Sequence, residues 1–164
     1  MTNIRQVCST IPVLRLIAAV VALCLPLSTT AQEVSECDWR ASARNLVEPW
    51  SQTTRTFANG KTRLTLIDIV EPAAGAYFLM ILSPPYDEME DRQCRLIGFS
   101  GGTGYAGMDF AKLEAGYDPA RGLVFTLPAM IYLPEKGFAN SALLKITLNQ
   151  SSGAITVDHQ LGRE

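Results

Sequence analysis

The stretch TTRTFANGKTRLTLIDIVEPAAGAYFLMILS (Thr53–Ser83) decides the fold class. Two strand-like runs, Thr53–Phe57 and Lys61–Val70, flank Ala58-Asn59-Gly60, and an Asn-Gly pair between such runs predicts a β-hairpin. The following run, Ala76–Ser83 (AYFLMILS), is apolar at both alternating positions. That pattern is typical of a central strand whose two faces are both covered.

The remainder of the chain continues this pattern of short apolar runs separated by turn residues. Pro84-Pro85 and the acidic run Asp87–Asp91 (DEMED) predict a surface loop, and the segment Met108–Tyr117 is ambiguous between a strand and a short helix. Pro128 should lie at a sheet edge or a bulge, because proline cannot donate a hydrogen bond to a neighbouring strand. Further strands are expected at Arg92–Ser100, Leu123–Leu133, Ser141–Asn149 and Ala154–Gln160.

Seven to eight short strands at regular spacing, joined by hairpins, predict an all-β domain. We expect an antiparallel sandwich or a small up-and-down barrel. One short helix is possible near the N-terminus, over Cys37–Val47, where Trp39 and Leu46 belong to an apolar series at roughly helical spacing. Ser35 could cap that helix.

The first 31 residues have the pattern of a secretory signal peptide. Arg5 and Arg15 are the only charges before Glu33, an apolar run covers Leu16–Leu27, and small residues end at Ala31. These three features in this order define a cleavable export signal. Cleavage after Ala31 would place the protein in the periplasm or outside the cell.

Two alternatives to this signal stay open. The apolar run of about 12 residues is short for a transmembrane helix, which needs about 20, but an uncleaved anchor is possible. A lipoprotein signal would place its modified cysteine at Cys24, although the bulky Leu23 precedes it where a small residue is expected.

Removal of residues 1–31 leaves 133 residues, 32–164, which is the size of one domain. This part holds 12 basic and 16 acidic residues, a formal charge of −4. It lacks the basic clusters that bind nucleic acid or an anionic membrane surface, so neither partner is expected after cleavage. We expect no cofactor.

Of the four cysteines, Cys37 and Cys94 remain after the predicted cleavage, and Cys8 and Cys24 leave with the signal. A disulfide between the remaining two is expected, since disulfides persist in exported proteins. Two free buried thiols are the alternative. A zinc site is not expected, because such sites want four close ligands and the chain has one histidine.

Gly98-Phe99-Ser100-Gly101-Gly102 matches G-x-S-x-G, the turn that carries the nucleophile of α/β-hydrolases. Ser100, then Asp109 or Asp118, then His159 also follow the chain order of the Ser–Asp–His triad in that fold. A small serine hydrolase is therefore the enzymatic hypothesis. The chain is short for that fold and lacks alternating strands and helices, so this hypothesis stays secondary to a non-enzymatic role.

Three further patterns have weaker functional interpretations. Gly102–Gly107 fits the G-x-G-x-x-G dinucleotide motif, but the helix and the acidic residue that should follow are missing. The acidic run could bind calcium weakly, without the ligand spacing of an EF-hand loop. Its candidate ligands are Asp87, Glu88, Glu90 and Asp91.

Several aromatic residues could form a surface on which a sugar or another ligand stacks. Scattered aromatics in a β-protein are more often core residues or cross-strand pairs, so both interpretations stay open. The four candidates are Trp50, Tyr86, Tyr105 and Tyr117.

The stretch FANGKTRLTLIDIVEPAAGAYFLMILSPPYDEMEDRQCRLIGFSGG (Phe57–Gly102), together with YDPARGLVF (Tyr117–Phe125), resembles small exported proteins of alphaproteobacteria without a known function. The resemblance covers most of residues 32–164. It implies a bacterial periplasmic or secreted setting and one compact domain, and it assigns no catalytic residue. The expected function is an exported, non-enzymatic protein that binds an unknown protein or small ligand. A barrel with an apolar interior would favour a small ligand, whereas a packed sandwich would favour contact with a protein.

Overall fold

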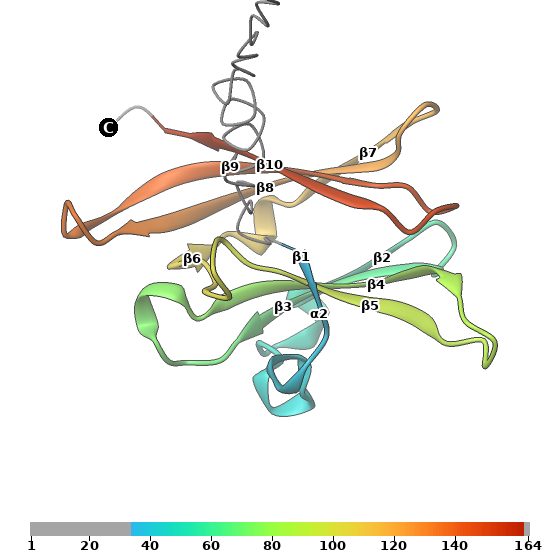
Figure 1. The fold of residues 1–164 in the computed structure, drawn as a ribbon, viewed down its shortest axis with the longest axis horizontal. Coiled ribbons are helices and arrows are strands. Elements are labelled where there is room, and N and C mark those ends of the chain that lie inside the picture. The colour runs from blue at the N-terminus through green and yellow to red at the C-terminus, as the bar shows by residue number, and fades with distance from the viewer. Residues whose placement is uncertain (1–33, 163–164) are drawn as a thin grey trace, which may run out of the picture. The chain divides into compact units, whose positions relative to one another are not determined.

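The computed structural model describes residues 34–162, and these form ten strands in two antiparallel sheets packed face to face (Figure 1). The sandwich is therefore confirmed, with more strands than the seven or eight expected. The first sheet has the order β1-β5-β4-β3-β2, and the second has the order β10-β9-β8-β6, with β7 also paired to β8. The strands of the first sheet are β1 (Val34–Glu36), β2 (Thr54–Phe57), β3 (Thr62–Asp68), β4 (Tyr77–Tyr86) and β5 (Arg92–Ile97). Those of the second are β6 (Gly107–Met108), β7 (Glu114–Asp118), β8 (Gly122–Leu133), β9 (Phe138–Leu148) and β10 (Ile155–Leu161).

The hairpin predicted at Asn59-Gly60 is confirmed as the β2–β3 connection. Ala58, Asn59 and Gly60 all have left-handed backbone angles, with φ of 52°, 56° and 83°. Asparagine and glycine adopt these backbone angles more easily than other residues do, so this pair favours the tight turn that connects β2 to β3.

β4 is the central strand of the first sheet, between β3 and β5, as its continuous apolar sequence predicted. The strand is longer than expected, because it continues through Pro84-Pro85 to Tyr86, where we predicted a loop. Its pairing with β5 shifts between Ser83 and Tyr86. The two prolines have no N–H groups, so the hydrogen-bond ladder is interrupted at this point.

The short helix predicted over Cys37–Val47 forms two 3-10 helices instead, η1 (Trp39–Ala41) and η2 (Ala43–Asn45). They are separated by Ser42, whose backbone is extended. The cap of η1 is Asp38, which accepts a hydrogen bond from the Arg40 backbone N–H, and Ser35 lies in β1. One turn of α-helix, α2 (Trp50–Thr53), follows.

Pro128 lies inside β8, at the position where the neighbouring strand changes from β7 to β6. Its carbonyl accepts a hydrogen bond from the Asp109 N–H at 2.9 Å, so its ring nitrogen also faces this break. The segment Met108–Tyr117, whose pattern was ambiguous, lies on both sides of this position. It contains the end of β6, the 3-10 helix η4 (Phe110–Lys112) and all but the last residue of β7. The proline is therefore tolerated at an interruption of the ladder, as predicted for a bulge or an edge.

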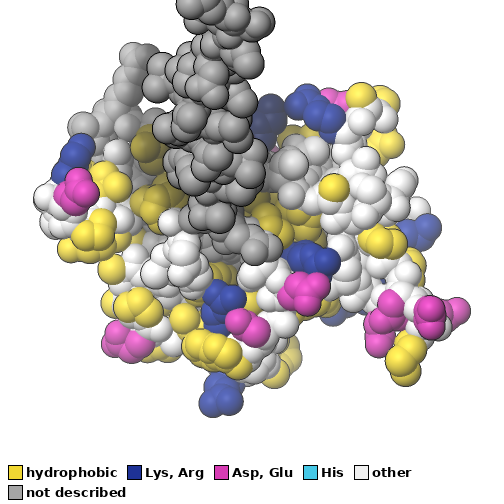
Figure 2. Space-filling view, viewed as in Figure 1, with side chains coloured by type: hydrophobic (Ala, Val, Ile, Leu, Met, Phe, Trp, Pro, Cys, Tyr) yellow, Lys and Arg dark blue, Asp and Glu magenta, His cyan; other side chains and the backbone are white. Residues whose placement is uncertain are grey.

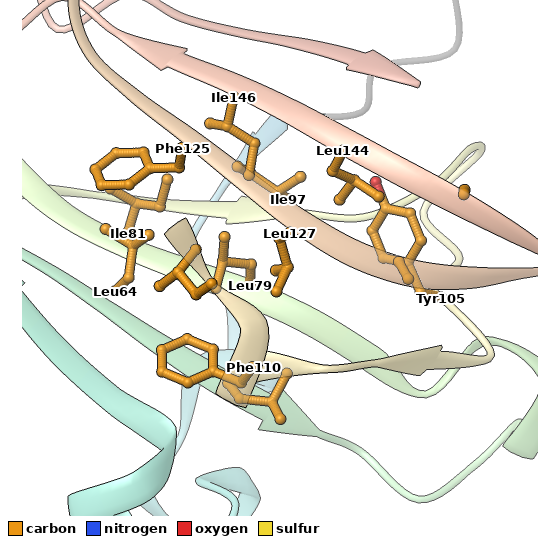
Figure 3. Packing of buried hydrophobic residues seen from close by; sticks show 14 of the residues in the cluster. Leu64, Leu79, Ile81, Ile97, Tyr105, Phe110, Phe125, Leu127, Leu144 and Ile146 are labelled. Atoms are coloured by element: carbon orange, nitrogen blue, oxygen red, sulfur yellow. The ribbon is translucent and has the colours of Figure 1, made fainter. Parts of the chain in front are cut away.

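Apolar side chains fill the space between the two sheets (Figure 3). They come from alternating positions of the strands, which is the pattern of a sandwich core. Those with no exposed surface include Leu64, Leu79, Ile81, Ile97, Tyr105, Phe125, Leu127, Ile131, Leu144, Ile146 and Leu148. The interior is a packed core and not the lumen of a barrel.

A second, smaller apolar cluster lies on the outer face of the first sheet. It contains Ile67, Phe78 and Leu96, and it is covered by residues 37–53, which we call the covering segment. In Figure 1 this segment lies on the side of the first sheet that faces away from the second sheet. The first sheet is therefore covered on both faces around Ile67, Phe78 and Leu96.

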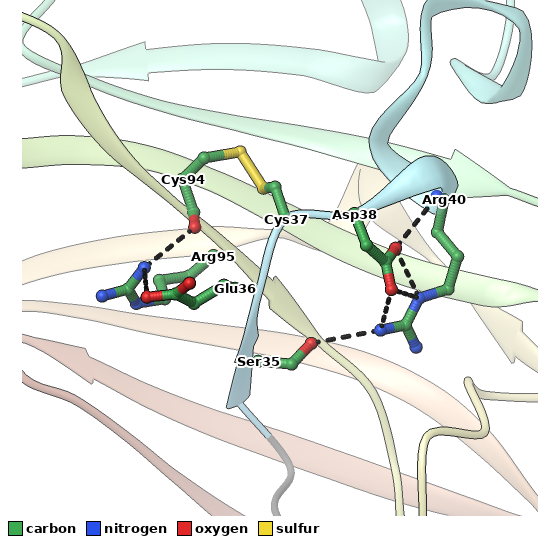
Figure 4. The surroundings of a disulfide bond; sticks show 7 residues. All are labelled: Ser35, Glu36, Cys37, Asp38, Arg40, Cys94 and Arg95. Atoms are coloured by element: carbon green, nitrogen blue, oxygen red, sulfur yellow. Dashed lines mark hydrogen bonds and ion pairs between the residues drawn. A yellow bond between two sulfur atoms is a disulfide. The ribbon is translucent and has the colours of Figure 1, made fainter.

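The predicted disulfide joins Cys37 to Cys94, with their Cα atoms 5.4 Å apart (Figure 4). The Cys37 N–H also donates to the Cys94 carbonyl at 3.2 Å. The bond attaches the start of the covering segment to β5, and the side chain of Cys37 packs on the smaller cluster.

The predicted signal peptide, residues 1–31, and its two cysteines, Cys8 and Cys24, lie outside the described residues. Within residues 34–162, no helix has the length and apolar character needed to cross a lipid bilayer.

Candidate functional site

Ser100, the candidate nucleophile, lies at one corner of a tight turn between β5 and β6. The Thr103 N–H donates to the Ser100 carbonyl at 2.9 Å, and Gly101 and Gly102 between them have φ of 58° and 84°. The match to G-x-S-x-G thus forms a hairpin turn. The strand-to-helix turn that exposes the nucleophile of a hydrolase is not formed here.

The glycines on either side of this turn make room for the ring of Phe78. A Cβ atom on Gly98 would lie 2.9 Å from that ring, and one on Gly104 would lie 2.8 Å from it and 2.4 Å from the Tyr77 carbonyl oxygen. Real Cβ atoms do not approach other atoms this closely. The glycine-rich sequence 98–107 therefore has a packing function. The next helix in the chain is η4, of three residues, whereas a dinucleotide site needs a long helix at this point.

His159, the candidate base, faces the core from β10. Its Nε2 atom lies 2.6 Å from the hydroxyl of the buried Tyr105, which also donates to the Gly98 carbonyl at 3.1 Å. The ring of Phe99 packs edge-on against the His159 ring, with centroids 5.7 Å apart. These contacts connect the second sheet to the loop that carries Ser100.

Asp118, one of the two candidate acids, lies far from Ser100. Ser100 and Tyr132 border the same hollow, and Tyr132 is near the end of β8. Asp118 instead pairs with Gly122, the first residue of β8. The stretch of β8 from Gly122 to Tyr132 spans about 33 Å. The structure therefore does not bring Ser100 and Asp118 together.

Both acids are also engaged in local contacts. Hydrogen bonds from the Ala120 N–H and then from Arg121 lower the pKa of Asp118 below its usual value. The Lys112 ammonium, 2.9 Å from Asp109, lowers the pKa of that carboxyl in the same way.

The four candidate calcium ligands, Asp87, Glu88, Glu90 and Asp91, lie in the β4–β5 turn, where acidic side chains gather at the lower right of Figure 2. The Asp87 carboxylate accepts hydrogen bonds from the backbone N–H groups of Met89 and Asp91, both at 2.9 Å. Among the described residues, no three His, Cys, Asp or Glu side chains are grouped closely enough to hold a metal ion.

The four aromatic candidates have different environments. Tyr105 is a core residue with no exposed surface, and Tyr117 is an exposed residue of β7. Trp50 and Tyr86 are exposed residues that each border a hollow in the surface. The sequence alone could not separate these cases, because burial depends on the pairing of strands.

A small hollow lies at the end of the sandwich that we call the loop end, formed by residues 69–76, 98–106 and 134–137. The hollow has a volume of about 210 Å³. Its walls are mainly aromatic and proline side chains, with two hydroxyl residues: Pro72, Phe99, Ser100, Thr103, Tyr132 and Pro134. Sequence reasoning singled out only Ser100, because the lining residues come from three segments of the chain that meet only in the fold.

The β3–β4 connection, which forms one wall, contains a strained residue. Val70 has a φ of 71°, between Ile69 and Glu71, and the Glu71 N–H donates to the Ile69 carbonyl at 2.8 Å. This is a γ-turn of the rare form, and a β-branched residue adopts it at a cost in free energy. Strain of this kind is often found next to functional sites.

This loop-end hollow is the candidate functional site. It combines an apolar wall, a strained loop and the neighbouring Tyr105–His159 hydrogen bond. No protein-family model, curated protein or solved structure matches the chain, so the proposal below depends on the geometry of the described residues.

Proposed function

We propose that this protein is an exported binding domain that contacts a protein partner at the loop end and catalyses no reaction. The size of the loop-end hollow is the observation that carries this proposal. Pockets for small molecules usually have volumes of about 300–1,000 Å³. The hollow at the loop end, about 210 Å³, has room for little more than one apolar side chain of a partner.

The packed interior supports a protein partner over an enclosed small ligand. A carrier of lipid or another apolar molecule needs a cavity inside its barrel or sandwich. Here, Leu127, Ile131 and Leu144 fill the centre of the sandwich, without exposed surface. Binding therefore has to use the outside of the domain.

The hollow is also held in place before a partner arrives. Phe99 is fixed against His159, and the turn that follows it is fixed by the packing of Gly98 and Gly104 on Phe78. A preformed pocket loses less conformational entropy on binding than a flexible one.

Export is part of the proposal, and two observations support it. Residues 1–31 have the order of charge, apolar run and small residues that defines a secretory signal. The Cys37–Cys94 disulfide is a bond that persists in oxidising compartments such as the periplasm. Mass spectrometry of the protein recovered from exporting cells tests this part, because cleavage after Ala31 gives a chain that starts at Gln32.

Site-specific photo-crosslinking tests the protein contact. A photoreactive amino acid at Tyr132, on the rim of the hollow, should give one discrete crosslinked product in exporting cells. The same amino acid at Tyr117, an exposed position distant from the loop end, is the matched control and should not give that product. Equal crosslinking from both positions, or none from Tyr132, would contradict the proposal.

The second candidate function is the serine hydrolase, favoured only by the nearness of Ser100 to the Phe99–His159 pair. An active-site-directed fluorophosphonate would label the folded protein in that case, and Ser100→Ala would abolish the label. The binding proposal predicts no labelling.

A further inference from the structure

A second hollow lies at the opposite end of the sandwich, which we call the turn end. It is bordered by the β2–β3 turn, the end of β4 and the β9–β10 turn, three segments that lie far apart in the sequence (Figure 1). Its volume is about 410 Å³, which is within the range of small-molecule sites. The residues that line it and carry polar or aromatic side chains are Asn59, Lys61, Tyr86, Gln150 and Ser151.

Tyr86 provides an aromatic surface in this hollow. The residue is 49% exposed, although it ends the central strand of the first sheet. Pro84, which precedes it by two residues, also lines the hollow. An exposed aromatic ring next to polar groups favours a ligand that has one apolar face and a polar edge.

Hydrogen-bonding groups of mixed type surround the ring. The amides of Asn59 and Gln150 can each donate and accept, the Ser151 hydroxyl can do both, and the Lys61 ammonium donates. Asn59 lies in the β2–β3 turn, with a φ of 56°. The Gln150 amide is oriented because its Nε2 atom donates to the buried Thr62 hydroxyl at 3.2 Å.

Hydrogen bonds attach the β9–β10 turn to the first sheet. The side-chain amide of Gln93 donates to the Gly153 carbonyl at 3.0 Å and to the Ser83 hydroxyl at 2.9 Å. Inside the turn, the Asn149 side-chain oxygen accepts from the Ser151 N–H at 3.0 Å. Polar groups that are already in place lower the entropic cost of binding.

The charge near the hollow restricts the class of ligand. The acidic turn 87–91 follows Tyr86 directly and carries four carboxylates. Two cations are also near: Lys61, and Arg92, whose guanidinium donates to the Gly60 carbonyl at 3.3 Å. They balance only half of the four carboxylates, so a nucleic acid or another polyanion would still meet net negative charge there. A neutral ligand with many hydroxyl or amide groups meets no such penalty.

We propose that the turn end is a binding site for a saccharide, in which one pyranose ring stacks on Tyr86 and hydrogen-bonds to Asn59 and Gln150. A pyranose has the required combination of an apolar C–H face and an edge of donors and acceptors. This site is separate from the loop end and does not depend on the protein-binding proposal.

Calorimetric titration of the exported protein with triacetylchitotriose and, separately, with cellotriose tests the proposal, together with amide chemical shifts measured by NMR. Saturable binding of either sugar, with shifts confined to the turn end, is the expected result. Tyr86→Ala should weaken that binding by about tenfold, the loss that is typical when one aromatic hot-spot residue is removed. Gln150→Ala should weaken it by a smaller factor.

Tyr117→Ala is the matched control, since Tyr117 is also an exposed tyrosine, but on β7. It should leave the affinity unchanged, and thermal unfolding of all variants should be the same. No saturable binding of either sugar would overturn the proposal. An equal loss in Tyr117→Ala, or shifts centred on another surface, would overturn it as well.

Discussion

The outer faces of the two sheets are built in opposite ways. On the first sheet, the outward residues Ile67, Phe78 and Leu96 are apolar and are covered by a third layer, the covering segment. On the second sheet, the outward positions of β8 and β9 mix polar residues such as Thr126 and Lys145 with apolar ones, and the apolar residues Met130 and Leu143 are 46% and 38% exposed. The first sheet therefore packs apolar side chains on both of its faces, whereas the second packs a buried apolar cluster only on its inner face.

The third layer has little intrinsic stability of its own. It consists of two 3-10 helices and a single turn of α-helix, and isolated helices of this length do not persist in water. Its attachment therefore depends on the disulfide, on Arg40 and on the contacts with Phe78. Substitutions on the outer face of the second sheet should change the free energy of unfolding much less. The following five predictions test this difference.

The largest effect is expected from removal of the disulfide. Cys37→Ser with Cys94→Ser should lower the free energy of unfolding by about 4 kcal/mol, because the bond closes a loop of 57 residues. Denaturant unfolding of the oxidised protein and of the double variant measures the loss. Reduction of the wild type should give the same value, and a loss below about 1 kcal/mol would show that the covering segment stays attached without the bond.

The packing of Gly104 against Phe78 and Tyr77 leaves no space for a side chain at position 104. Gly104→Ala should lower the free energy of unfolding by about 3 kcal/mol, since the new methyl group would lie 2.4 Å from the Tyr77 carbonyl oxygen. Gly116→Ala on β7 is the control, because a Cβ atom there meets nothing within 4 Å. It should leave the stability unchanged or raise it by up to about 1 kcal/mol. Similar losses in both variants would remove the contrast between the sheets.

Arg40 holds the covering segment through its guanidinium group, which lies 4.9 Å from the centre of the Phe78 ring and donates to the Gly102 carbonyl at 3.0 Å. Its side chain is only 12% exposed. Arg40→Ala should cost about 2 kcal/mol, through the loss of the cation–π contact and of charge-assisted hydrogen bonds. Arg44→Ala, an exposed arginine on the same segment, should cost less than about 0.5 kcal/mol in the same unfolding experiment.

Asp38 adds a small, pH-dependent contribution. The hydrogen bond from the Arg40 side chain lowers the pKa of the Asp38 carboxyl in the folded protein. Its stabilisation is therefore present above the usual carboxyl pKa of about 4 and is lost as the pH falls through the lowered folded value. Because the Asp38 side chain is 42% exposed, Asp38→Asn should cost less than about 1 kcal/mol at pH 7. A difference from wild type that does not shrink as the pH falls below about 4 would contradict this origin.

The smallest effects are expected on the outer face of the second sheet. Met130 and Leu143 are 46% and 38% exposed, and Met130→Thr and Leu143→Thr should each change the free energy of unfolding by less than about 0.5 kcal/mol. Denaturant unfolding at two protein concentrations measures this. A loss above about 1 kcal/mol would show that this face is covered in solution.

The sequence predicted the parts of the fold that depend on local patterns. The Asn59-Gly60 hairpin, the central strand β4 and the Cys37–Cys94 bond were all visible, because each depends on residue types in a short stretch or on a simple count. The strands β1 and β6, of three and two residues, have too little periodicity to be detected. Each is defined by its pairing with a longer strand, β1 with β5 and β6 with β8.

The candidate site was predictable only in small part. Ser100 was a candidate because of the G-x-S-x-G match, although the first glycine of that match packs against Phe78. Pro72, Tyr132 and Pro134 belong to no sequence motif that would have marked them as site residues. Their proximity results from the register of three separate strand pairs, which no local pattern reports. The interpretation of Tyr86 as a stacking residue was open for the same reason, since its exposure depends on where β4 ends.

Each sheet is made from one uninterrupted half of the chain: β1–β5 lie within residues 34–97, and β6–β10 lie within residues 107–161. In a chain exported from its amino end, both cysteines and the whole first sheet would therefore cross the membrane before any strand of the second sheet. The Cys37–Cys94 bond could form at that stage, because it needs nothing C-terminal to β5. Oxidation would then precede the assembly of the sandwich, and the second sheet would form on a first half that is already closed.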